Sequence, residues 1–184
     1  MSTLLKRFDS PAPKKILALD GGGIRGALSL GYLKKMEEIL REKYHGNKED
    51  FRMSDYFDLI GGTSTGAIIA ALLAMGNTVD HIIKLYMDLG DKIFAEKRGW
   101  WNPKSWFATY GYEGMEEGLK LAYGENTTVG SDRIKTGLCI VAKRADTNSI
   151  WPMINHPRGK YYDKPNAKNK NLFSYLTGSE TIVI

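Results

Sequence analysis

The sequence predicts an α/β fold built around a central, mostly parallel β-sheet, and three features support this prediction. Two short apolar runs, residues 15–20 and 56–60, each lead into a glycine-rich turn and then into a helical pattern. A third run, residues 135–142, is followed by residues 150–154, which we expect to pair with it in the antiparallel sense. Strands that alternate with helices in this order are typical of a parallel sheet with helices packed on it.

The composition indicates one soluble domain with a substantial core. The chain has 184 residues, of which 42% are hydrophobic, so most of it should fold. Its single cysteine, Cys139, lies in an apolar run and is expected to be a structural thiol in a reducing compartment. No apolar stretch approaches the roughly 20 residues of a membrane span, and the amino terminus lacks the apolar part of a signal peptide. We therefore expect a cytoplasmic protein without a transmembrane segment.

The first elements follow from the residue pattern in chain order. Residues 1–13 are polar and contain two prolines, so they predict a flexible leader before a domain that spans 14–184. Residues 15–20 predict a buried strand. The helix after the first turn should end near 45–46, before a polar loop at 47–54, and its apolar face contains Leu33, Met36, Ile39 and Leu40.

The later elements alternate in the same way. Residues 56–60 predict a second strand, and residues 67–75 are apolar almost all round, which indicates a buried helix. Residues 99–112 are rich in aromatic side chains and are expected to be irregular. They would form an apolar wall of an acyl-chain site, a membrane-touching flap, or a loop anchored on the core. A short helix is expected at 113–123. Residues 79–94 predict an amphipathic helix with one face formed by Val79, Ile82, Ile83, Tyr86, Leu89 and Ile93.

The first glycine turn, residues 20–26 (DGGGIRG), follows a strand and opens a helix. Glycines leave backbone N–H groups uncovered, and the start of a helix adds unpaired N–H groups with a partial positive charge. Such a turn can bind an anion. The spacing of Gly21, Gly23 and Gly26 fits a dinucleotide-binding fingerprint, and the same turn fits an oxyanion hole equally well.

The second glycine turn, residues 62–66 (GTSTG), has the spacing Gly-x-Ser-x-Gly between a strand and a helix. A sharp turn of this kind holds its serine in a strained conformation with the hydroxyl presented, and the small residues Gly62 and Gly66 avoid clashes around it. The pattern predicts Ser64 as a nucleophile. It also predicts that the N–H of Thr65 points to the position where an oxyanion forms.

The two turns together are more specific than either turn alone. In two parallel strand–helix units, both turns lie at the same edge of the sheet, outside the carboxyl ends of the strands. One turn would then supply a hydroxyl group and the other would supply backbone donors for developing negative charge. These are the first two requirements of acyl transfer.

At these residues the sequence resembles the patatin-like phospholipase family. The resemblance runs from about residue 15 to 142, where 20–26 is similar to the family's D-G-G-G-x-[RK]-G segment and 62–66 to its G-x-S-x-G elbow. It implies a three-layer α/β/α fold and hydrolysis of lipid acyl esters by a protein that acts peripherally at a membrane surface. It also implies a Ser–Asp dyad that needs no metal and no cofactor.

The resemblance also assigns roles to individual residues. It implies that Ser64 is the nucleophile and that the backbone N–H groups of Gly22, Gly23 and Thr65 form the oxyanion hole. Arg25 is the basic residue of the first motif, where it either holds the loop or meets a phosphate group.

One part of the family's pattern is missing from this sequence. The dyad Asp belongs to a D-G-G or D-G-A motif downstream of the serine, whereas the one Asp-Gly pair here is Asp20-Gly21, in the first turn. We therefore expect a chain truncated before that Asp, with little or no turnover on its own, because loss of a triad member in serine hydrolases lowers the rate by about 10⁴-fold or more.

Several alternatives stay open at this point. His156 follows Ser64 in the chain order of α/β-hydrolases and is therefore a candidate base. The turn at 20–26 would also suit a Rossmann-like nucleotide-binding module, and a non-catalytic lipid-binding pseudoenzyme or fragment would equally lack the Asp. The net charge of +5 indicates either a solvated surface or tail, or attraction to an anionic membrane surface, and no nucleic-acid-binding signature accompanies it.

Overall fold

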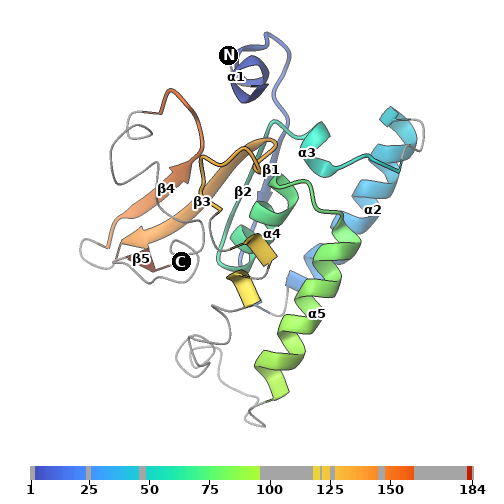
Figure 1. The fold of residues 1–184 in the computed structure, drawn as a ribbon, viewed down its shortest axis with the longest axis vertical. Coiled ribbons are helices and arrows are strands. Elements are labelled where there is room, and N and C mark those ends of the chain that lie inside the picture. The colour runs from blue at the N-terminus through green and yellow to red at the C-terminus, as the bar shows by residue number, and fades with distance from the viewer. Residues whose placement is uncertain are drawn as a thin grey trace.

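The computed structural model describes residues 3–23, 26–45, 49–95, 118–120, 122–124, 127–144, 148–159 and 182–183. Five helices and five strands lie in these ranges, and Figure 1 shows their arrangement. In chain order they are α1 (Thr3–Asp9), β1 (Ile16–Leu19), α2 (Gly26–His45), α3 (Met53–Tyr56), β2 (Leu59–Thr63), α4 (Thr65–Ala74), α5 (Val79–Ala95), β3 (Gly137–Arg144), β4 (Ile150–Ile154) and β5 (Ile182–Val183).

The sheet is mostly parallel, which confirms the predicted fold class. Its strand order is β1-β2-β3-β4, in which β1, β2 and β3 run parallel and β4 pairs with β3 in the antiparallel sense, as does β5. Leu19 of β1 lies opposite Gly62 of β2, so the two strands reach their carboxyl ends side by side. This register brings the turns that follow them to one edge of the sheet.

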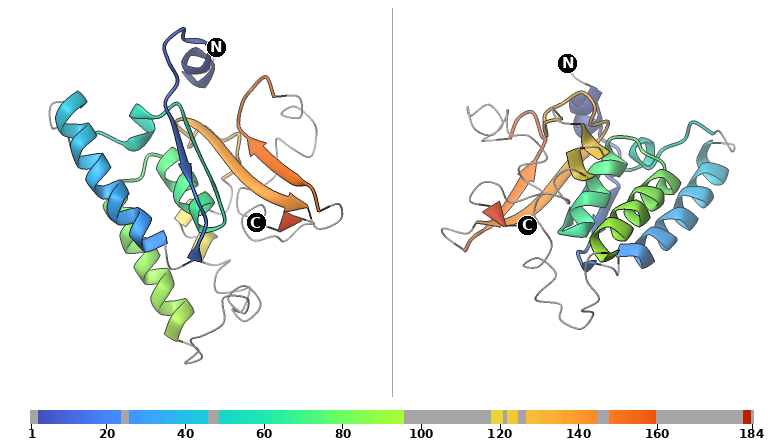
Figure 2. Two further views of the ribbon diagram at one scale, coloured as in Figure 1. Left: turned by 180° about the vertical axis from the view of Figure 1, so that it is seen from behind. Right: turned by 60° about the horizontal axis from the view of Figure 1, so that its bottom comes forward.

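Helices α2, α4 and α5 form a layer on one face of the sheet. Figure 2 shows them together on one side, with α4 directly behind β1 and β2. Helix α4 is buried along almost its whole length because its residues are small or aliphatic all round. On the opposite face, Ile16 is 63% exposed and Ile154 is 45% exposed. The second helical layer that the resemblance implies is not formed by any of the described helices.

Two elements differ from the sequence-based expectations. A flexible leader is predicted at 1–13, but α1 occupies Thr3–Asp9, where Arg7 donates to the Ser54 and Asp55 carbonyls at 2.6 and 2.5 Å and pairs with Asp58 at 3.1 Å. These tertiary contacts order a segment that has little intrinsic helical signal. The domain bounds of 14–184 stay a prediction.

The second strand also begins later than its apolar run suggests. Residues 53–56 form α3 because the Asp55 carboxylate accepts the N–H of Arg52 at 2.8 Å and closes a helical turn. The strand β2 then starts at Leu59 and continues through both glycines to Thr63. The predictions for 99–112 and for most of 113–123 lie outside the described residues.

The pairing of α2 with α5 involves a buried carboxylate. Glu37 of α2 is only 7% exposed, and its two carboxylate oxygens lie 3.2 and 3.4 Å from the N–H of Val79, at the start of α5. Burial raises the pKa of Glu37 above its ordinary value of 4.5, although the Val79 hydrogen bond opposes this shift. The nearby pair Lys34–Asp80, at 2.6 Å, also links the two helices but is exposed.

The raised pKa predicts how Glu37→Gln changes stability with pH. A carboxyl group whose pKa is higher in the folded state favours folding at pH values below its unfolded pKa, and this contribution is lost as the pH rises through the folded pKa. The amide oxygen of glutamine can still accept the Val79 N–H. We therefore expect the melting temperature of Glu37→Gln, measured by circular dichroism, to rise relative to that of the wild type as the pH increases from 4 to 7.

The matched control is Glu42→Gln, an exposed glutamate on the same helix. It should show no such pH-dependent difference. A Glu37→Gln protein that loses stability at pH 7 would mean that the carboxylate's charge at the start of α5 outweighs its desolvation.

Candidate active site

Ser64 is the single residue between β2 and α4, and its backbone is strained. Its φ is 50° and its ψ is −128°, a left-handed φ that is uncommon for a residue other than glycine. Such a conformation costs about 1–3 kcal/mol and persists only where the surrounding structure enforces it. Strain of this kind is what a strand–serine–helix elbow requires, because it turns the side chain outward at the end of the strand.

The two glycines of the elbow allow β1, β2 and α4 to meet backbone against backbone. A Cβ on Gly66 would lie 2.3 Å from the Leu19 carbonyl oxygen, and a Cβ on Gly62 would lie 2.6 Å from the Gly66 carbonyl group. Any other residue at either position would separate the strand ends from the helix. The spacing Gly-x-Ser-x-Gly therefore has a packing reason here as well as a chemical one.

The first glycine turn lies directly against Ser64. A Cβ on Gly21 would lie 2.7 Å from the Ser64 Cβ, so the Gly21 backbone is in contact with the serine side chain. The Gly21 N–H donates to the Thr63 hydroxyl at 2.9 Å, which ties the first turn to the elbow. The expected neighbouring position of the two turns is thus present. Thr63 occupies a variable position of the Gly-x-Ser-x-Gly motif, so the motif alone does not predict this contact.

Several polar groups at this edge have no hydrogen-bond partner within the described residues. They include the N–H groups of Gly22 and Gly23 and the hydroxyl of Ser64. The N–H of Thr65 lies in the first turn of α4, where no intrahelical acceptor is available. Gly21 is different, because its N–H is already bound to Thr63. Within the described residues, the N–H groups of Gly22, Gly23 and Thr65 are therefore unpaired, and Gly21 is the residue of the first turn that touches the Ser64 side chain.

Thr65 also has an unpaired polar group in its side chain. Its hydroxyl is buried and has no hydrogen-bond partner among the described residues. A buried hydroxyl without a partner costs free energy, which is unusual in a native structure. This places one further unsatisfied polar atom next to Ser64.

Tyr86 of α5 supports the first turn from the side of the helical layer. Its hydroxyl donates to the Gly23 carbonyl and occupies the space that a Cβ on Gly26 would need, 2.8 Å away. Burial raises the pKa of Tyr86, so the hydroxyl stays protonated at neutral pH. The helical pattern predicts Tyr86 on the apolar face of its helix, and the structure adds the contact of its hydroxyl with the turn.

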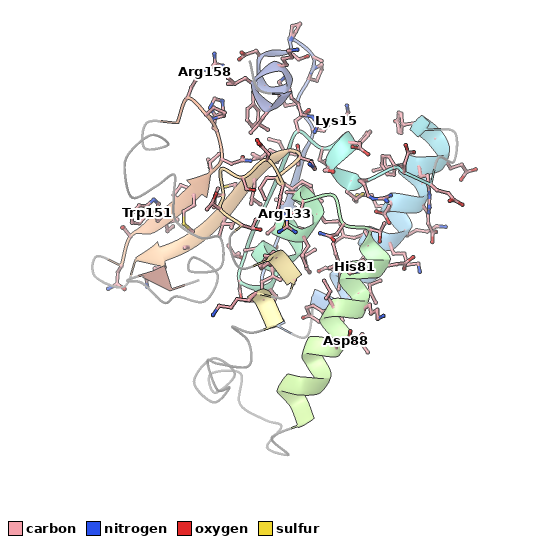
Figure 3. All side chains as sticks on the ribbon, viewed as in Figure 1. Lys15, His81, Asp88, Arg133, Trp151 and Arg158 are labelled. Atoms are coloured by element: carbon pink, nitrogen blue, oxygen red, sulfur yellow. The ribbon has the colours of Figure 1, made fainter. Side chains whose placement is uncertain are left out.

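The structure excludes His156 as the base for Ser64. The Asn155 N–H donates to the Leu138 carbonyl near the start of β3, so His156 lies near the amino ends of the parallel strands. There its ring stacks on Phe8 of α1. Figure 3 shows Arg158, two residues further on, beside α1. Ser64 lies five residues beyond the start of β2, which is roughly 16 Å along the sheet at about 3.3 Å per residue. His81 is exposed on α5.

Arg25 lies outside the described residues, so its role stays a prediction. The described part of the chain contains no cluster of three or more His, Cys, Asp or Glu side chains that could hold a metal ion. Cys139 is half-buried on β3, and burial raises the pKa of its thiol. None of the described helices is both long enough and apolar enough to cross a membrane.

Comparison with known proteins identifies related sequences. The family model described as Patatin-like phospholipase matches residues 17–173. Patatin-like protein 4 of Arabidopsis thaliana is 36% identical over 147 residues, which cover 76% of this chain and 35% of that protein. A cUMP-AMP-activated phospholipase of Escherichia coli is 40% identical over 96 residues, 52% of this chain and 27% of that protein.

A further relative is named as inactive. The Probable inactive patatin-3-Kuras 1 of Solanum tuberosum is 40% identical over 86 residues, 43% of this chain and 22% of that protein. The matches therefore cover at most 35% of the length of these three relatives.

Proposed function

The chain belongs to the patatin-like phospholipase family, and from this premise we propose that it provides the nucleophile and the oxyanion hole of a serine lipid acyl hydrolase. The single observation that carries the proposal is the contact between the Gly21 backbone and the Ser64 side chain, at the carboxyl ends of two paired strands. This contact supports the proposal that the Ser64 nucleophile and the unpaired N–H donors of the first turn act on the same ester group. The family membership favours this function over a nucleotide-binding module.

The proposed reaction begins with attack by the Ser64 hydroxyl on the carbonyl carbon of a lipid ester. A bond forms between Oγ and that carbon, the carbonyl oxygen becomes an oxyanion, and the serine proton passes to a base. The N–H groups of Gly22, Gly23 and Thr65 stabilise the oxyanion, which then collapses and releases the alcohol part of the lipid. Water hydrolyses the acyl-enzyme and restores the Ser64 hydroxyl.

The base in this scheme is the Asp of the dyad that the family resemblance implies. None of the carboxylates in the described ranges hydrogen-bonds Ser64. Without a base, serine hydrolases keep only about 10³–10⁴-fold acceleration over water from the oxyanion hole and binding. The proposed activity of this chain is accordingly weak.

The proposed substrate is a lipid ester at a membrane surface that the protein contacts peripherally from the cytosol. Two features support contact with such a surface. Leu28 and Tyr32, on the first turns of α2 after the glycine turn, are 66% and 70% exposed, and the chain carries a net charge of +5, which attracts anionic lipids.

A second candidate function is lipid binding without catalysis. The observation that favours it is the similarity to a relative that is named as inactive. Under this proposal the two turns hold an ester or phosphate group that is not cleaved.

A labelling experiment tests the proposed catalytic role. A fluorophosphonate should phosphonylate Ser64 with loss of fluoride, and intact-mass analysis should show one added group on the wild type and none on Ser64→Ala. Release of fatty acid from phosphatidylglycerol vesicles should likewise exceed that of Ser64→Ala. Equal labelling of both proteins would show that Ser64 is not the nucleophile. No labelling of either, with vesicle binding by both, would establish the second candidate.

A further inference from the structure

Tyr86 contacts the first glycine turn from outside both motifs. Its hydroxyl donates to the Gly23 carbonyl oxygen and lies 2.8 Å from the position of a Cβ on Gly26. Gly26 is buried, and the phenol fills the space beside it. A neutral hydroxyl group is thus held against the turn by a side chain 63 residues away from Gly23 in sequence.

The Gly23 carbonyl is separated from the Gly23 N–H group by the φ and ψ rotations of Gly23, so a contact that holds this carbonyl limits how far the turn can rotate at that residue. A peptide unit is planar, so the turn can change shape only by rotation about the φ and ψ angles of its residues. Gly23 has a φ of 56°, and glycine imposes almost no limit on these rotations. A hydrogen bond to the Gly23 carbonyl is therefore an effective way to fix the orientation of the turn.

The turn is held at two points. Near its start, the Gly21 N–H donates to the Thr63 hydroxyl at 2.9 Å, and at its middle the Gly23 carbonyl accepts from the Tyr86 hydroxyl. Gly22 lies between these two hydrogen bonds. The position of Tyr86 is itself fixed, because the Glu37–Val79 and Lys34–Asp80 contacts hold α5 against α2.

From this arrangement we infer that Tyr86 is a positioning residue, which keeps the Gly22 and Gly23 N–H groups in the orientation that an oxyanion beside Ser64 requires. The inference rests on the proposed function, because positioning matters only if an oxyanion forms there. Tyr86 acts through the turn and does not itself contact the reacting atoms.

The test compares Tyr86→Phe with a matched tyrosine elsewhere. Tyr123 is fully buried and also donates its hydroxyl to a backbone carbonyl, that of Ile68 at 3.2 Å. Both substitutions to phenylalanine remove one hydroxyl hydrogen bond, so both should lower the melting temperature by a similar amount. Loss of one oxyanion donor lowers kcat by about 10²–10³-fold in serine hydrolases, so misorientation should slow fluorophosphonate labelling of Ser64 by about tenfold or more.

The expected result is slow labelling in Tyr86→Phe and a rate within about twofold of the wild type in Tyr123→Phe, measured where both are fully folded. Wild-type labelling by Tyr86→Phe, or equal slowing in both variants, would overturn the inference. Ser64→Ala reports separately on the proposed function.

A spectroscopic readout covers the case in which the wild type is not labelled at all. In ¹⁵N-glycine protein, Tyr86→Phe should shift the amide resonances of Gly22 and Gly23, while Tyr123→Phe should leave them in place. Unshifted Gly22 and Gly23 resonances in Tyr86→Phe would show that the hydroxyl does not orient the turn, whatever the chemistry of Ser64.

Discussion

Replacement of Gly66 by alanine should destabilise the fold more than any other single methyl group added at this site. The new Cβ would lie 2.3 Å from the Leu19 carbonyl oxygen and 2.7 Å from that of Asp20, and both are backbone atoms that cannot move aside without displacing β1. Overpacking in a core costs about 1–3 kcal/mol and occasionally more. We expect a loss of about 3 kcal/mol, since two backbone groups must shift.

Chemical denaturation of Gly66→Ala provides the measurement, with Gly31→Ala as its control. Gly31 lies within α2, and a Cβ there would meet no atom within 4 Å. Alanine is favoured over glycine in a helix by roughly 1 kcal/mol, so Gly31→Ala should be as stable as the wild type or more stable. Equal stability of Gly66→Ala and the wild type would contradict the close approach of β1, β2 and α4 described above.

Gly21→Ala should lower the reactivity of Ser64 strongly while it lowers the stability of the fold only modestly. Its Cβ would lie 2.7 Å from the Ser64 Cβ and 2.9 Å from the Thr63 carbonyl oxygen, so the methyl group must push the first turn away from the elbow. Because this turn lies at the sheet edge, we expect only about 1–2 kcal/mol of lost stability. Labelling of Ser64 by a fluorophosphonate should fall by about 10²-fold, the effect of losing one oxyanion donor.

The labelling rates of Gly21→Ala and Gly31→Ala, measured at a temperature where both are folded, decide this prediction. Gly31→Ala should react like the wild type. A Gly21→Ala protein that reacts at the wild-type rate would show that the first turn plays no part in activating Ser64, and the proposed oxyanion hole would have to be abandoned.

The two glycine turns could be predicted from the sequence because their requirements are local. Gly62, Ser64 and Gly66 lie within five residues, and the backbone contacts that demand glycine arise from the same sharp turn. The parallel pairing of β1 with β2 follows from two successive strand–helix units. Spacing along the chain therefore carried enough information to place these residues together.

The residues that support the turns could not be predicted, because their contacts connect distant parts of the chain. Thr63 and Gly21 are 42 residues apart, and Tyr86 and Gly23 are 63 residues apart. Their side chains also have ordinary alternative roles, on a strand end and on an apolar helix face. The helix α1 was missed for the same reason, since Arg7 is held by residues that lie more than 45 positions later.

The face of the sheet opposite α2, α4 and α5 carries three exposed isoleucines on β1 and β4. Ile16, Ile150 and Ile154 present 63%, 76% and 45% of their surfaces to water, and each buried Å² of such surface is worth about 25 cal/mol. Salts such as sulfate, which are excluded from protein surfaces, strengthen this tendency to leave water. We therefore expect sulfate to promote self-association of the chain through the exposed isoleucines of β1 and β4.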